Sequence, residues 1–269
     1  MLAPAALEAF DAFLIELNRA AGKVILPLFR GETGLEDKGD PGAFDPVTAA
    51  DRGAEGAIRK LIGERYPDHG VIGEEYGEDR ADADFVWVLD PIDGTRAFIA
   101  GLPVWTTLIA LRVEETPAVG SICQPYVGEL FIGGGGAARL MSRGASRPLG
   151  VRHDAPLSRA IIATTDPEAC FNANERAAWR ALRAASRLAR LGCDAYAYAM
   201  VAAGVIDLVV ESGLKCWDID AAIPVIAGAG GLVTDWHGAT VGARGGQVAI
   251  AGGRGVLDEA LALLEPAAQ

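Results

Sequence analysis

The chain has 269 residues, of which 51% are hydrophobic and 22% charged, a balance typical of a globular protein rather than a disordered one. The formal net charge of −12 argues against nucleic acid as a partner, because phosphate backbones are bound by clustered positive charge. We find no leader of the signal-peptide type and no apolar run approaching about 18 residues, so we expect a cytoplasmic protein that does not enter a membrane. The 4 cysteines and 3 histidines are scattered, without the spacing of a zinc site.

Two helices are predicted near the start of the chain, separated by a loop. Apolar residues recur every three or four positions over 5–30, which indicates a long amphipathic helix that Pro27 would kink. The stretch 31–44 is rich in Gly, Pro, Asp and Lys and predicts a hairpin or mobile loop. The second helix covers 45–61 and places Asp51 on its inward face. A buried carboxylate needs a metal or another partner, and the alternative is an arginine pair or a helix cap.

The most informative stretch is a strand that ends in carboxylates. An apolar run at 85–89 predicts a short buried strand, and Asp90 follows it directly. Pro91 cannot continue ladder pairing, and the Asp-Gly pair at 93–94 turns the chain. The next residues, 95–99, can open a helix whose free amides point outward. Such a turn could hold both a cation and a phosphate, and the alternative is an ordinary turn whose aspartates only cap backbone groups.

Two other acidic segments also follow short apolar runs. They are Gly-Glu-Glu at 73–75 and Lys-Cys-Trp-Asp at 215–218. Carboxylates at the ends of several strands are what a hard, oxygen-seeking divalent ion requires. Without a cation they would repel, by ~4 kcal/mol for two charges about 4 Å apart at an effective dielectric near 20. The three segments therefore predict one shared cation site.

These segments together resemble a known family. Gly-Glu-Glu at 73–75, Asp-Pro-Ile-Asp-Gly-Thr at 90–95 and Trp-Asp at 217–218, in this order, are similar to the signature of the inositol monophosphatase family. Its members are magnesium-dependent, lithium-sensitive phosphatases of small molecules. The resemblance covers nearly the whole chain. It implies an α/β (α+β) fold, a layered α-β-α-β-α sandwich, in a single catalytic unit over 1–269. An N-terminal lobe would end at about 137 and a C-terminal lobe would begin at about 138, and a homodimer is expected.

The remaining pattern fits this architecture. Strands predicted at short spacing suggest an antiparallel meander at 105–113, 117–124 and 130–133, after the strand at 71–73. Four consecutive glycines at 133–136 predict a flexible hairpin tip rather than a phosphate loop. In the second half, strands near 160–164, 187–191, 206–211, 231–235 and 247–251 alternate with helices near 172–186, 194–204, 218–229 and 255–264.

The resemblance assigns ligands for two or three Mg2+ ions. One ion would take Glu74, Asp90 and the Ile92 carbonyl, and a second would share Asp90 and add Asp93 and Asp218. Two ions about 3.5–4 Å apart can activate a water and neutralise a leaving oxygen. No Ser or Cys nucleophile is needed and no covalent intermediate is expected.

It also assigns roles to groups around the ions. Thr95 would orient or deprotonate the attacking water, with Glu74 beside it and Asp51 behind it, while the amides of Gly94 and Thr95 would hold phosphate oxygens. Glu75 is left out of the site. Lys38 stands near the position of a loop lysine of the family and could bring charge to the phosphate, although a solvated surface lysine is an equal alternative.

Substrate-side candidates follow from departures within the family. Glu211 precedes Asp218 by seven residues, a spacing similar to that of an inositol-contacting glutamate. Gly192-Cys193-Asp194 stands where inositol-preferring members carry Gly-Thr-Ala. The extra carboxylate at the substrate's far end suits an ammonium or imidazolium rather than a neutral polyol, although Asp194 could instead cap the next helix. With Arg96-Ala97-Phe98 in place of Thr-Asn-Phe, these segments resemble the histidinol-phosphate phosphatase branch. Asp93, Arg96, Gly192 and Asp218 complete the expected substrate contacts.

One segment departs from the usual run Trp-Asp-x-Ala-Ala-Gly. Here it reads Trp-Asp-Ile-Asp-Ala-Ala-Ile-Pro at 217–224, so that Asp220 is extra and would compete for the metal or face solvent. Pro224 is unusual in the first turns of a helix.

The function implied by this resemblance is hydrolysis of L-histidinol phosphate to L-histidinol and phosphate, a step of histidine biosynthesis. The first alternative is a phosphatase of inositol-1-phosphate or a related sugar phosphate. The second alternative is a regulatory binding protein in which catalysis is vestigial. The partner in the first two cases is a small phosphate monoester, with no nucleic acid and no membrane.

Overall fold

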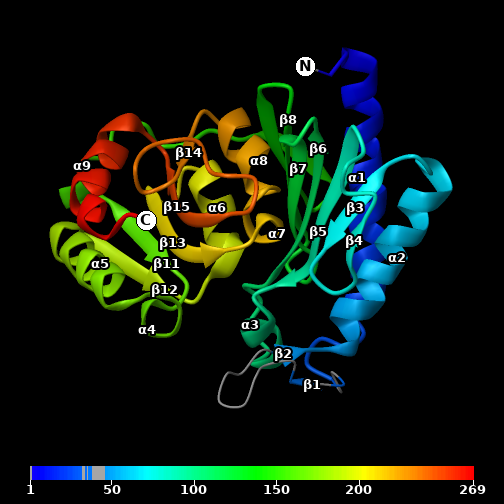
Figure 1. Ribbon diagram of the computed structural model, residues 1–269, viewed down its shortest axis with the longest axis horizontal. Helices are drawn as coiled ribbons and strands as arrows, with labels where there is room; N and C mark the ends of the chain where they lie inside the picture. Colours follow the sequence, from blue (N-terminus) through cyan, green and yellow to red (C-terminus); the bar gives the residue numbers. More distant parts are fainter. Residues whose placement is uncertain (1, 32–33, 35, 38–45) are drawn as a thin grey trace.

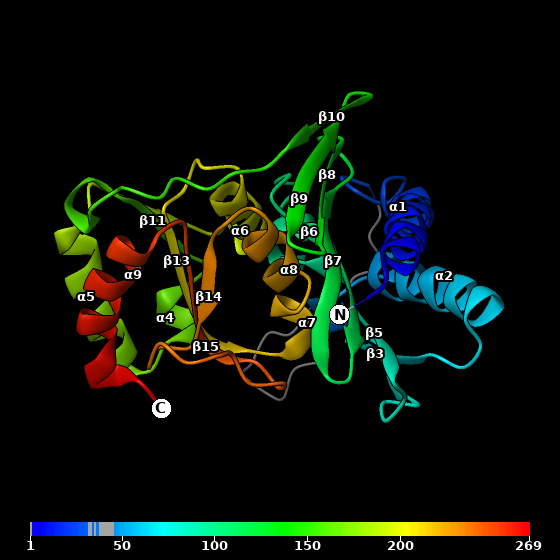
Figure 2. The same ribbon diagram turned by 90° about the horizontal axis from the view of Figure 1, so that it is seen from above.

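The computed structural model describes residues 2–31, 34, 36–37 and 46–269. Its elements stack in five layers, which confirms the expected α-β-α-β-α sandwich (Figure 1). Helices α1 and α2 cover one face of a larger sheet, and α6, α7 and α8 lie between the two sheets. Helices α5 and α9 cover the outer face of the smaller sheet (Figure 2). No described helix combines the length and apolar character that crossing a membrane requires.

The outer layer of the N-terminal half consists of α1 (Pro4–Ile25) and α2 (Ala49–Arg65). Helix α1 ends two residues before Pro27 and so is not kinked by it; Leu26 still has helical backbone angles, and Pro27 has no amide hydrogen with which to continue the helix. Of the predicted loop at 31–44, the structure describes residues 31, 34 and 36–37, and β1 (Glu36–Asp37) pairs antiparallel with β2 (Pro46–Val47). Residues 46–47, predicted to open the second helix, are therefore a short strand, and α2 begins after its cap at Thr48.

The larger sheet has eight strands in the order β10-β9-β8-β7-β6-β5-β3-β4. Strand β3 runs parallel to β5, and every other pair in this sheet is antiparallel, so the predicted meander is confirmed. The strands span Gly70–Gly73 (β3), Gly77–Asp79 (β4), Phe85–Asp93 (β5), Thr106–Val113 (β6), Thr116–Gln124 (β7), Glu129–Gly134 (β8), Ala137–Ser142 (β9) and Ala145–Pro148 (β10). Strands β4, β9 and β10 were not predicted, and the sheet runs on to Pro148. The division into lobes at about 137 stays a prediction.

The smaller sheet has five strands in the order β12-β11-β13-β15-β14, with β11 parallel to both of its neighbours. Its strands span Ile161–Thr164 (β11), Leu188–Leu191 (β12), Leu208–Leu214 (β13), Leu232–Thr234 (β14) and Gly246–Ala251 (β15). The helices of this half span Pro167–Cys170 (α4), Ala173–Ala185 (α5), Asp194–Ala202 (α6), Cys216–Ile219 (α7), Ala222–Gly228 (α8) and Arg254–Leu264 (α9). The alternation of strands and helices follows the prediction closely.

The predicted helix at 218–229 is two helices, α7 and α8, with a break at residues 220–221. Pro224 is the third residue of α8. It lacks an amide hydrogen where the first turn of a helix would leave that hydrogen without an intrahelical partner, so its position needs no distortion.

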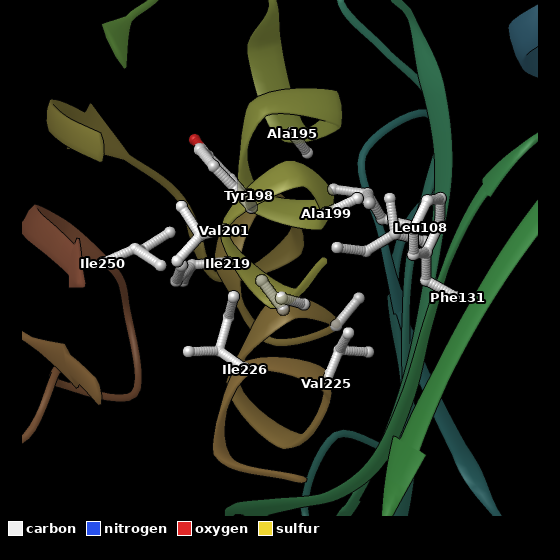
Figure 3. Packing of buried hydrophobic residues seen from close by; sticks show 14 of the residues in the cluster. Leu108, Phe131, Ala195, Tyr198, Ala199, Val201, Ile219, Val225, Ile226 and Ile250 are labelled. Carbon is white, nitrogen blue, oxygen red and sulfur yellow. The ribbon is translucent and has the colours of Figure 1, made fainter. Parts of the chain in front are cut away.

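The central apolar cluster joins the two sheets through α6 and α8. Figure 3 shows Leu108 and Phe131 of the larger sheet on one side of these helices and Ile250 of the smaller sheet on the other. The helices approach the larger sheet at two glycines. A Cβ on Gly120 would lie 2.9 Å from the Ala221 Cα, and one on Gly133 would lie 2.5 Å from the Val225 amide nitrogen. Gly133 is therefore a packing position within β8 and not part of a flexible tip.

Candidate metal centre and active site

The site is built around the end of β5, which continues past the predicted end at Leu89. The pairing with β6 shifts register between Asp90 and Asp93, so Pro91 lies in a bulge, where a missing amide hydrogen is tolerated. The Ile92 amide donates to Asp90 Oδ1 at 3.0 Å, and the Thr107 hydroxyl donates to the Pro91 carbonyl at 2.8 Å. These hydrogen bonds hold the backbone of the bulge, from which the side chains of Asp90 and Asp93 project.

Three carboxylates from both halves of the chain meet there. One oxygen each from Asp90, Asp93 and Asp218 lies within 4.8 Å of the others. Asp218 projects from α7, where its Oδ2 accepts a hydrogen bond from the Lys215 amide at 2.6 Å. The structure thus brings together three of the predicted ligands in an acidic metal site. The donor set consists of carboxylate oxygens, the ligands that Mg2+ prefers.

The electrostatics of this cluster also fit a cation. Burial, and then the neighbouring carboxylates, raise the pKa values of Asp90 and Asp93 well above the usual range. Burial raises the pKa of Asp218 to about 6, and Asp194 adds to the increase. A divalent ion would relieve both the desolvation of these carboxylates and their mutual repulsion.

Glu74 lies beside the cluster, directly after β3. Its amide donates to the Leu89 carbonyl at 3.2 Å, and after burial its charge is the largest cause of the raised pKa of Asp90. The loop that carries it is held by Glu55 of α2, which is fully buried. The Glu55 carboxylate accepts from the amides of Glu75 at 2.9 Å and Tyr76 at 3.2 Å. This role of Glu55 was not predicted, although Glu55 follows Asp51 by four residues on the same helical face.

Asp51 points inward as predicted and is 1% exposed. Its Oδ2 accepts from the Thr48 amide at 2.8 Å and from the Thr48 hydroxyl at 2.5 Å, in a capping box at the start of α2. Burial raises the pKa of Asp51 to about 6, and Asp51 in turn helps to raise the pKa of Asp90. The structure therefore shows a helix cap that also contributes negative charge to the cluster.

The turn after Asp93 provides donors rather than carboxylates. Gly94 has a φ of 84°, in the left-handed region that favours glycine, and precedes the short helix α3 (Thr95–Ile99). The Thr95 hydroxyl donates to the Ile92 carbonyl at 3.2 Å, so it lies beside the carbonyl that the sequence predicts as a ligand.

Asp194 comes to this same turn from the other half of the chain. A Cβ on Gly94 would lie 2.9 Å from Asp194 Oδ2, so the carboxylate lies against Gly94. It is therefore near the metal-binding turn, and its predicted role toward the substrate stays a prediction. Burial raises the pKa of Asp194 to about 6, an effect that the Arg96 guanidinium opposes.

Asp194 is not a helix cap, because its side chain makes no capping hydrogen bond and it is already the first residue of α6, with a φ of 45°. Asp93 takes this role from across the site, since its Oδ2 accepts from the Ala195 amide at 2.6 Å. A carboxylate at a helix N-terminus is favoured both by the hydrogen bond and by the helix dipole. This bond joins the metal cluster directly to α6.

Glu211 of β13 is 3% exposed and held by threonines. Its Oε1 accepts from the Thr165 amide and hydroxyl, both at 2.8 Å, and its Oε2 accepts from the Thr164 hydroxyl at 3.2 Å. Burial raises the pKa of Glu211 to about 8, and the charge of Asp194 adds to the increase, so the two carboxylates are neighbours.

A partly exposed ion pair lies near Asp194. Arg96 Nη1 of α3 lies 3.7 Å from Asp166 Oδ2, just before α4. Gly192 has a φ of 73° and donates its amide to the Thr165 carbonyl at 2.9 Å, so it shapes the segment that precedes Asp194.

Two predictions about surrounding residues have different outcomes. Asp220 neither faces solvent nor joins the metal cluster, because it is buried in an ion pair with Arg112 of β6. Nothing in the sequence marks Arg112 as its partner. Lys38 lies outside the described residues.

A layered sandwich with an acidic metal site at the end of β5 defines a metal-dependent phosphomonoesterase. The chain belongs to the inositol monophosphatase family, whose sequence model matches residues 6–266.

Similar proteins support this placement. The chain is 42% identical to the bifunctional phosphatase IMPL2, chloroplastic, of Arabidopsis thaliana, over 86% of the chain and 66% of that protein. It is 35% identical to a histidinol-phosphatase of Chlorobaculum parvum, over 83% and 85% of the two chains. An inositol monophosphatase from Zymomonas mobilis has a similar structure, with a TM-score of 0.84 at 36% identity, over 97% of this chain and 99% of that one.

Proposed function

We propose that this protein hydrolyses L-histidinol phosphate to L-histidinol and phosphate. The observation that carries the proposal is Asp194, whose carboxylate lies against Gly94 beside the metal cluster. A carboxylate in this position offers a counter-charge for a cationic leaving group, which a polyol does not need. Histidinol-phosphatases are among the proteins similar to this chain, at 35% and 33% identity.

For the metal we propose Mg2+, with two or three ions held by Glu74, Asp90, the Ile92 carbonyl, Asp93 and Asp218. Bound magnesium would supply positive charge to the phosphate oxygens and lower the pKa of a coordinated water. The close approach of three carboxylates from the two halves of the chain, with Asp90 buried and the other two partly exposed, supports this assignment, since a cation would relieve their mutual repulsion.

The protein's own groups would orient the reaction. The amides of Gly94 and Thr95 would bind phosphate oxygens at the start of α3, because they are free of helical partners. The Thr95 hydroxyl would orient the attacking water and pass its proton toward the carboxylates of Glu74 and Asp51. The contacts that fix Thr95 and Asp51 are in place in the described structure.

The leaving group would be recognised from the second lobe. Asp194 would pair with the ammonium or imidazolium, and Glu211 would accept a hydrogen bond from the same group. Arg96 and Gly192 would shape the entrance on either side. In this arrangement Asp93 and Asp218 face both the metal and the substrate.

A second candidate is a phosphatase of inositol-1-phosphate or a related sugar phosphate. The Arabidopsis relative is described as bifunctional, and an inositol-1-monophosphatase of Synechocystis is 31% identical to this chain. A vestigial binding protein has less support, because every predicted ligand carboxylate is present in the sequence. A homodimer and a cytoplasmic location stay predictions, and light scattering would test the first.

The test compares phosphate release from L-histidinol phosphate and from inositol-1-phosphate in the presence of Mg2+. We expect a preference of about a hundredfold for histidinol phosphate in kcat/KM, ~2.7 kcal/mol of transition-state discrimination. Asp194→Ala should raise KM for histidinol phosphate far more than for inositol-1-phosphate, while the exposed control Asp258→Ala changes neither. A preference for inositol-1-phosphate, or an equal effect of Asp194→Ala on both, contradicts the assignment.

A further inference from the structure

The extra carboxylate Asp220 connects the two halves of the molecule. Asp220 is 3% exposed and forms an ion pair with Arg112, which is 7% exposed. Arg112 Nη2 also donates to the Ala243 carbonyl at 2.6 Å. One guanidinium thus joins β6 of the larger sheet to the break between α7 and α8 and to the loop before β15.

This contact is made at one end of the helix that carries Asp218. Helix α7 is only four residues long, too short to hold its own shape by helical hydrogen bonds. At its start the Lys215 amide binds Asp218 Oδ2, and at its end the Asp220 amide donates to the Cys216 carbonyl at 2.9 Å. Ile219 and Ala221 also pack here and are buried, and the Arg112–Asp220 pair adds a charged contact of defined direction between this end and the larger sheet.

The attachment point belongs to the same rigid unit as the other ligands. Strand β6 pairs with β5 along its length, with Asp90 opposite Leu108 and Val86 opposite Arg112. Arg112 is therefore fixed relative to Asp90 by continuous sheet hydrogen bonds. When Arg112 holds the end of α7, it therefore also fixes the position of α7 relative to Asp90 and the metal cluster.

We propose that the Arg112–Asp220 ion pair positions Asp218 for metal binding. It holds α7 on the larger sheet and so keeps the Asp218 carboxylate close to Asp90 and Asp93 before any ion is bound. This inference rests on the proposed function, because it assumes that these three residues bind a divalent ion. Neither Arg112 nor Asp220 is itself a ligand or a catalytic residue.

The physical reason lies in repulsion among the three carboxylates. Without an anchor, the short α7 would relax away from β5 in the metal-free protein, and binding would have to reorder it. A buried ion pair is a poor source of stability, since an apolar pair of similar volume is often as stable. Its directional hydrogen bonds do fix an orientation, and the planar fork of arginine suits this purpose.

The test is the double variant Arg112→Met/Asp220→Ala, which removes both charges and leaves no buried charge unpaired. The matched control is Asp11→Ala/Arg139→Met, which removes a 2.5 Å ion pair between α1 and β9 on the other face of the same sheet. Binding of Mn2+ is measured by calorimetry and activation by Mg2+ is measured by phosphate release. We expect metal binding and activation to weaken about tenfold in the test variant, the range seen for groups that orient ligands, with little change in kcat at saturating Mg2+. The control should match wild type.

Each outcome decides between distinct possibilities. Wild-type metal affinity in the folded double variant overturns the positioning role. If that variant does not fold, Asp220→Glu displaces the carboxylate by one methylene while keeping its charge. Weaker Mn2+ binding by Asp220→Glu then supports the role, and unchanged binding overturns it. Failure of the wild-type protein to bind Mn2+ at all overturns the proposed function itself. This outcome is distinct from failure of the positioning role, in which the wild-type protein and the double variant bind Mn2+ equally well.

Discussion

The turn at the end of β5 and the N-terminus of α6 contribute to the same site in different ways. In the turn, Asp90, Ile92 and Thr95 are bound to one another across two or three residues. At α6, the bond from the Ala195 amide to Asp93 joins groups 102 residues apart. Two carboxylates of the metal cluster thus come from one contiguous segment, whereas Asp218, which completes the cluster, and the proposed substrate side depend on how the two sheets pack against α6, α7 and α8.

The largest expected effect tests the contiguous segment. Asp93→Asn should lower kcat by more than about a thousandfold, because the site loses one of its four proposed carboxylate ligands. An asparagine oxygen can still accept from the Ala195 amide, so the fold should be retained. Phosphate release and circular dichroism measure the two effects. Activity near wild type would exclude Asp93 as a ligand.

The next effect concerns the support beneath that segment. Glu55→Ala should lower the free energy of unfolding by about 3 kcal/mol, since it leaves Arg59 and two amides without their buried partner. Chemical denaturation measures this change. The control is the exposed ion pair of Lys60 and Glu64, whose charged atoms lie 3.9 Å apart. Lys60→Ala removes this contact and should change the free energy of unfolding by less than about 0.5 kcal/mol. Equal effects of both substitutions would show that Glu55 is not an essential support.

A pH-dependent effect tests the environment of Glu211, in the second half of the chain. The folded pKa of Glu211 is about 8, above its ordinary value of about 4.5, so the folded state holds a proton that the unfolded state releases. Its contribution to stability is present below pH 4.5 and is lost as pH rises toward 8. In the metal-free wild-type protein, Glu211 should make the free energy of unfolding decrease with pH between pH 5.5 and 7. Glu211→Gln should reduce the slope of this decrease by about 1 kcal/mol per pH unit. Denaturation over this range in EDTA measures it, and Glu265→Gln should leave the slope unchanged.

The smallest effect returns to the turn. Thr107→Val removes the hydroxyl that binds the Pro91 carbonyl while keeping the shape of the side chain. We expect a loss of about 1 kcal/mol in stability. A moderate loss in kcat should accompany it because the bulge is less firmly held. Thermal unfolding and phosphate release measure both. A stable variant with unchanged activity would show that β5 pairing alone fixes the bulge.

Local patterns in the sequence predicted most of the helices and strands and a shared cation site, whereas the resemblance to the family supplied the layered arrangement and the individual ligands. Apolar periodicity marked the helices and most strands, and the carboxylates of the metal site stand at predicted strand or helix ends. Strands β4 and β10 were missed because they are exposed along their length, and β9 was missed although it is partly buried and contains four apolar residues. The extension of β5 through Pro91 was also missed, because a bulge depends on the partner strand.

The substrate side could be predicted only in part. Asp194 was correctly singled out as unusual, but its position against Gly94 depends on the packing of α6. The partner of Asp220 lies 108 residues away and the threonines that hold Glu211 lie 46 and 47 residues away. Such partners carry no local signal, so only the tertiary structure identifies them.

The glycines that α8 meets on the larger sheet have a consequence for recombination between relatives. At Gly120 and Gly133, the backbone of one half occupies the space that a side chain of the other half would need. A chimera that joins one half of this chain to the complementary half of a relative should therefore assemble only if small residues are kept at both positions. The close contact at these two glycines therefore restricts which halves of related proteins can be exchanged, even when every metal ligand is preserved.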